Sequence, residues 1–144
     1  MTGIRNRTMH YQTQYRIDPT PQQAHKLRQY VGGGDAEIVL TESGLEASTD
    51  DLMAFAKGAE RSTELRQHTV SMAEEHDPEE LVEQGRQVAK EALDGNFVVS
   101  VHTADDVNPH LHIAEFAHEN RGSDFAITPV RESLENYIDD PTAW

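Results

Sequence analysis

From residue 9 to residue 17 the chain alternates strictly between two kinds of side chain. Met, Tyr, Thr, Tyr and Ile occupy every second position, with His, Gln, Gln and Arg between them. A period of two is typical of a strand with one buried face. Further strands are predicted at 36–41, 65–73, 97–103 and 110–117, of which 97–103 is a dense run of apolar, mostly β-branched residues.

Helical signals separate these strands. Residues 20–23 (Thr-Pro-Gln-Gln) combine a capping residue, a proline suited to the first helical position and a capping-box glutamine. The most regular helix is expected between Asp77 and Gly95, where apolar residues recur at i, i+3/i+4 and i+7. Two more helices are expected to begin near Ser48 and near Thr128.

The predicted order is therefore β-α-β-α-β-α-β-β-α. At 144 residues the chain is long enough for one buried core. We expect a single α+β domain over 1–144, with a mainly antiparallel sheet of about five strands and helices packed on one face, as in ferredoxin-like folds.

Composition narrows the function classes. Cysteine is absent, which excludes disulfides, thiolate metal sites and cysteine nucleophiles. The formal net charge is −14, and the few basic residues are mostly arginine, a composition that resembles the proteins of extreme halophiles. No apolar run approaches the roughly 18 residues of a membrane helix, and no signal peptide follows Met1. We expect a cytoplasmic protein with no membrane association.

The charge is unevenly distributed. Residues 1–31 carry a net charge of +4, whereas the rest of the chain carries −18. The basic segment is a candidate site for a polyanion such as single-stranded DNA. Alternatively, it pairs with the acidic body of the protein. Its cationic residues are Arg5, Arg7, Arg16, Lys26 and Arg28.

Three histidines form the sharpest local motif, in the sequence Val-His-Thr-Ala-Asp-Asp-Val-Asn-Pro-His-Leu-His-Ile at 101–113. If the flanking strands pair antiparallel, residue 110 faces either Thr103 or His102. In the second register His102, His110 and His112 share one face of the sheet.

Clustered imidazoles are typical ligands of a divalent ion, here Mn²⁺, Mg²⁺ or Zn²⁺. Asp105 and Asp106, in the intervening loop, are candidates for orienting a histidine or a metal-bound water. The first register would separate His102 from the other two histidines. Alternatively, all three are ordinary polar residues of the sheet.

The motif resembles the histidine triad of plasmid mobilisation relaxases, the HUH-type DNA nickases. The upstream strand around 68–72, the helix from Pro78 to Leu93 and the strand from Phe97 follow the same order as in that family. The resemblance implies a metal held by the three histidines and a tyrosine that attacks a DNA phosphodiester. Tyr30 best matches that nucleophile; otherwise it packs at the end of its helix. Ala104 occupies a position at which the family has an acidic residue. The chain could therefore be an active nickase or a degenerate relative that only binds DNA.

A second interpretation is a non-enzymatic small α+β domain of a halophilic cytoplasm that acts by self-association or by binding a partner. An open five-stranded sheet leaves two edges, and homodimerisation is a common way to cover such surfaces.

Overall fold

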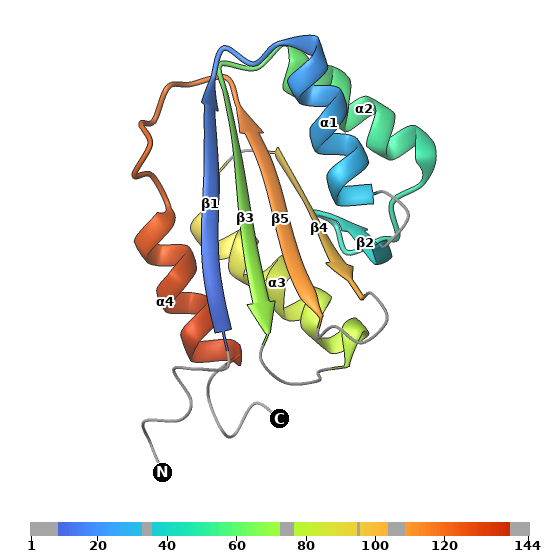
Figure 1. The fold of residues 1–144 in the computed structure, drawn as a ribbon, viewed down its shortest axis with the longest axis vertical. Helices are drawn as coiled ribbons and strands as arrows, with labels where there is room; N and C mark the ends of the chain where they lie inside the picture. Colours follow the sequence, from blue (N-terminus) through green and yellow to red (C-terminus); the bar gives the residue numbers. More distant parts are fainter. Residues whose placement is uncertain (1–8, 33–35, 73–76, 95, 104–108, 139–144) are drawn as a thin grey trace.

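A computed structural model of the chain describes residues 9–32, 36–72, 77–94, 96–103 and 109–138. Within these residues the elements follow the predicted order (Figure 1). The strands are β1 (Met9–Ile17), β2 (Ala36–Thr41), β3 (Glu64–Met72), β4 (Asn96–His102) and β5 (His110–Ala117). The helices are α1 (Pro21–Gly32), α2 (Thr49–Glu60), α3 (Pro78–Ala92) and α4 (Ile127–Ile138).

The helices begin where their capping residues lie. At α1 the Gln23 amide donates to Thr20 Oγ1 over 3.1 Å, and the Thr20 amide donates to Gln23 Oε1 over 3.0 Å. Ser48 and Asp51 form the same reciprocal box at α2, and Asp77 caps α3. These side chains satisfy amide groups that have no partner within the helix.

The five strands form one sheet in the order β1-β3-β5-β4-β2, with every neighbouring pair antiparallel. The long strands β1, β3 and β5 lie side by side (Figure 1). The prediction of an α+β domain with a five-stranded antiparallel sheet is confirmed.

The expectation that all helices pack on one face is wrong. Two core clusters lie on opposite faces of the sheet. Helices α3 and α4 cover the face that carries Val99, Val101 and Ile113. Helices α1 and α2 cover the other face, around Val98 and Phe116. The continuous apolar run in β4 supplies side chains to both, and such runs are typical of strands buried on both faces.

Helix α2 packs tightly on the sheet at Gly58. A Cβ built there would lie 2.4 Å from Cζ of Phe116, a buried ring in edge-to-face contact with Phe55. We expect Gly58→Ala to lower the free energy of unfolding by about 1–3 kcal/mol in urea denaturation. Lys57→Ala, at the exposed neighbouring position, is the control. A stabilised Gly58→Ala, as expected for an open helix position, would contradict the contact.

None of the helices within the described ranges is long and apolar enough to cross a membrane.

Candidate functional site

Three histidines lie together at one end of the sheet. His102 on β4 pairs directly with His110 on β5, which is the second of the two registers considered from the sequence. His112 lies opposite Ser100 on β4 and Thr69 on β3. Because alternate residues of a strand share a face, all three imidazoles are on the α1/α2 face of the sheet.

The three imidazole rings differ in burial. The ring centroids of His102 and His112 are 4.2 Å apart, and those of His110 and His112 are 6.5 Å apart. His112 is 2% exposed, whereas His102 and His110 are half-buried. Burial, with a smaller contribution from the two neighbouring histidines, lowers the pKa of His112 to about 3. His112 is therefore neutral at physiological pH, which is the form that binds metals.

The residue types in this cluster suit a divalent metal ion, but the arrangement of their side chains does not. Neutral imidazole is a ligand for Zn²⁺ and other transition metals. Nevertheless, no group of three His, Asp or Glu side chains is arranged to hold an ion within the described ranges. The backbone brings the three rings to one face, and ring rotations would be required for their nitrogens to converge. Asp105 and Asp106 lie outside the described residues.

The tyrosines divide between the two faces of the sheet. Tyr30 is in the last turn of α1, a helix on the same face as the histidines, and its side chain is outside what the structure describes. Tyr11 and Tyr15 are on the opposite face. The Tyr11 hydroxyl is 2.6 Å from His68 Nδ1, and the Tyr15 hydroxyl donates to Glu64 over 3.1 Å. Tyr11 also packs against the core cluster on that face.

The predicted basic surface is split by helix α1. Arg16 and Lys26 line a cavity between α1 and the strands β1 and β3. Arg28 instead lines a hollow between α1 and α2, beside Lys57. Arg5 and Arg7 lie outside the described residues.

A buried ionic cluster on the α3/α4 face was not predicted. Arg66 Nη1 is 3.4 Å from Glu64 and 3.0 Å from Glu115, and all three side chains are fully buried. Arg121 lies 2.6 Å from Glu64 and 3.0 Å from Glu115. The only signal in the sequence is the alternation of Glu64, Arg66 and His68, which places them on one face of a strand.

The two carboxyl groups of this cluster respond differently to their surroundings. Burial alone would raise the pKa of Glu64, but hydrogen bonds and charge from Arg121 hold it below its usual value. Burial raises the pKa of Glu115, although Arg121 and Arg66 oppose the shift. This network ties the segment around Arg121 to β3 and β5, so its role is structural.

In comparisons of the chain with protein-family models, curated proteins and solved structures, no match was found.

Proposed function

We propose that this protein is an HUH-like DNA-processing domain that binds a divalent metal ion through His102, His110 and His112. The observation that carries the proposal is the β4–β5 register, which places the three histidines on the face that α1 covers. A metal ion at this position would polarise a DNA phosphodiester and offset its negative charge. Single-stranded DNA would lie on the same face, close to the imidazoles.

In this proposal Tyr30 is the nucleophile. Its hydroxyl oxygen would attack the phosphorus, and the phosphorus–O3′ bond would break. The upstream segment of the DNA would leave with a free 3′-hydroxyl, which takes up the proton lost by the tyrosine. The downstream segment would remain bound to Tyr30 through its 5′-phosphate. Support comes from the position of Tyr30 in a helix on the histidine face.

Metal content tests the first part of the proposal. Wild-type protein in molar KCl is expected to bind Mn²⁺ or Zn²⁺ stoichiometrically, and His110→Ala and His112→Ala are expected to lose the ion. His25→Ala, an exposed histidine on α1, is the control and should bind metal as the wild type does. Absence of metal from the wild type, or equal binding by all variants, would overturn the proposed metal site.

Nicking activity tests the second part. Incubation with labelled single-stranded DNA should give a covalent protein–DNA adduct, and Tyr30→Phe should remove the adduct without changing metal content. DNA binding without an adduct in the wild type would identify a degenerate, non-nicking relative.

A second candidate function, self-association, is favoured by the edges of the sheet. Within the described residues, β1 and β2 are each hydrogen-bonded to one neighbouring strand only. Such edges can pair with a second chain. If the metal assay fails, a dimer in sedimentation at high salt would support this alternative, and a monomer would exclude it.

A further inference from the structure

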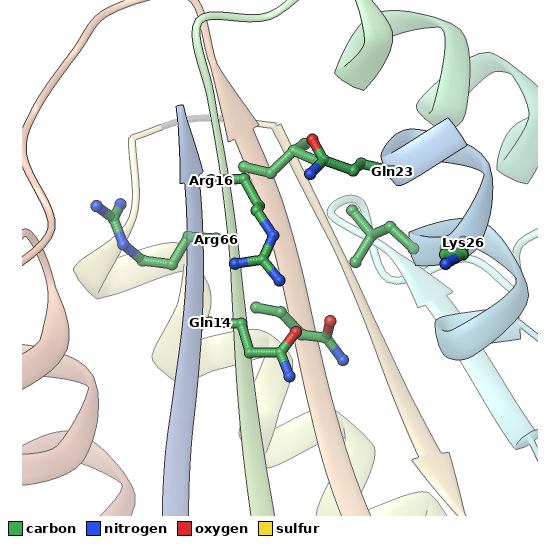
Figure 2. A pocket seen from close by; sticks show the side chains of 8 residues that line it. Gln14, Arg16, Gln23, Lys26 and Arg66 are labelled. Atoms are coloured by element: carbon green, nitrogen blue, oxygen red, sulfur yellow. The ribbon is translucent and has the colours of Figure 1, made fainter. Parts of the chain in front are cut away.

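A cavity of about 260 Å³ lies between α1 and the strands β1 and β3, on the same face as the histidines (Figure 2). No aspartate or glutamate is among the residues that line it, in a chain whose net charge is −14. Its wall is formed mainly by Gln14, Arg16, Gln23, Lys26, Leu65 and Gln67.

Two cations contribute to this cavity from different elements, Arg16 from β1 and Lys26 from α1. Neither is within ion-pair distance of a carboxylate of the described residues. Arg66 also borders the cavity, but its guanidinium is buried on the opposite face and paired with Glu64 and Glu115. Figure 2 shows its side chain extending away from Arg16. The charge available to a ligand is therefore that of Arg16 and Lys26, which suits an anion.

The rest of the wall suits a planar group with a polar edge. Gln14 and Gln67 are cross-strand partners, so their amide side chains lie next to each other. Each amide offers two donors and an acceptor, and glutamine pairs in this way with the N6 and N7 atoms of adenine. Leu27 and Leu65, both buried, add apolar surface.

The size and position of the cavity indicate part of a polymer rather than a whole cofactor. Its volume is slightly below the roughly 300 Å³ at which small-molecule sites begin. Gln67 is two residues from Thr69, the cross-strand partner of His112, so the cavity begins about 7 Å along the strand from the histidine cluster. A short stretch of extended single strand would span that distance.

We propose that this cavity binds one nucleotide of the single-stranded DNA. Arg16 and Lys26 bind its phosphate, and Gln14 and Gln67 bind the edge of its base, preferentially adenine. The inference rests on the proposed function and adds a subsite that reads sequence beside the metal cluster.

The test is the affinity of fluorescently labelled oligo-dA and oligo-dT for the wild type and four variants. Arg16→Gln and Lys26→Gln are each expected to weaken binding about tenfold. Each should also make the dependence of log affinity on log salt less steep by about 0.7 per lost phosphate contact. Gln67→Leu should reduce the preference for oligo-dA severalfold. Lys57→Gln removes a charge from α2, outside the cavity, and should bind as the wild type does.

Metal content, measured on the same samples, separates this inference from the proposed function. If the wild type binds DNA and metal, but the cavity variants bind DNA as tightly as Lys57→Gln does, the nucleotide site is wrong and the proposed function stands. If the wild type binds no single-stranded DNA, both are overturned. Weakened binding in the cavity variants with unchanged metal content supports the site.

Discussion

Lowering the pH from 6.5 to 4.5 is expected to reduce the free energy of unfolding by up to about 3 kcal/mol through His68 alone. His68 is fully buried, and burial, with the nearby charge of Arg66, lowers its pKa to about 3. The unfolded chain takes up a proton near pH 6.5, whereas the folded chain does so only near pH 3. The contribution of neutral His68 to the free energy of unfolding is therefore fully present above pH 6.5. It is lost as the pH falls from 6.5 toward 3.

The surroundings of His68 explain why it remains neutral. Burial raises the pKa of Tyr11, so its hydroxyl stays protonated, and this hydroxyl forms a hydrogen bond of 2.6 Å with His68 Nδ1. The other ring nitrogen, Nε2, has no hydrogen-bond partner in the described part of the chain. The ring of Tyr11 in turn lies 5.5 Å from the guanidinium of Arg131. Protonation would put a hydrogen on both ring nitrogens, so Nε2 would carry an N–H group without an acceptor, and the added positive charge would lie near that of Arg66.

Urea denaturation between pH 7 and pH 4.5, in molar KCl with a chelator, measures this effect. His68→Gln is expected to make the loss of stability with falling pH less steep by up to about 1.4 kcal/mol per pH unit. His25→Gln, at an exposed position on α1, should leave the slope unchanged. A His68→Gln slope equal to that of the wild type would show that the pKa of His68 is the same in the folded and the unfolded protein.

The elements of this fold are encoded locally, and for that reason the sequence predicts them well. The period of two in β1 and the capping box at Thr20 and Gln23 depend on neighbouring residues alone. Helix α3 ends at Ala92, one residue before the expected Leu93. Leu93 adopts an extended conformation, and its side chain joins the core.

Properties that depend on pairing between distant segments are not encoded in this way. The two β4–β5 registers differ by one residue, and only the folded sheet distinguishes them. In the same way, Arg16, Lys26 and Arg28 form one basic group in the sequence. The position of α1 places Arg28 apart from the other two.

The buried ionic cluster was beyond prediction for a further reason. Charged residues are usually exposed to solvent, so the sequence gives no reason to expect that Glu64 and Arg66 are buried. They are buried because Glu115 and Arg121, about fifty positions later, neutralise them. The sequence of β3 itself contains no signal for ion pairs with residues so distant in the chain.

Arg66→Met is expected to lower the free energy of unfolding by about 3–5 kcal/mol at neutral pH. Arg66 is 1% exposed, and its guanidinium donates hydrogen bonds to both Glu64 and Glu115. Without it, two buried carboxylates share the single remaining charge of Arg121. The loss should be smaller in acid than at neutral pH, because burial already raises the pKa of Glu115, and a protonated Glu115 no longer needs a cationic partner.

A double-variant cycle measured by urea denaturation separates the lost ion pairs from lost packing. Arg66→Met combined with Glu115→Leu should recover much of the stability lost in Arg66→Met, because apolar residues replace a buried ion pair at little cost. Arg86→Met, which breaks the partly exposed pair with Glu83, is the matched control and should cost less than about 1 kcal/mol. If the double variant is no more stable than Arg66→Met, the loss arises from the packing of Arg66 against Tyr15 and Phe125 rather than from its charge.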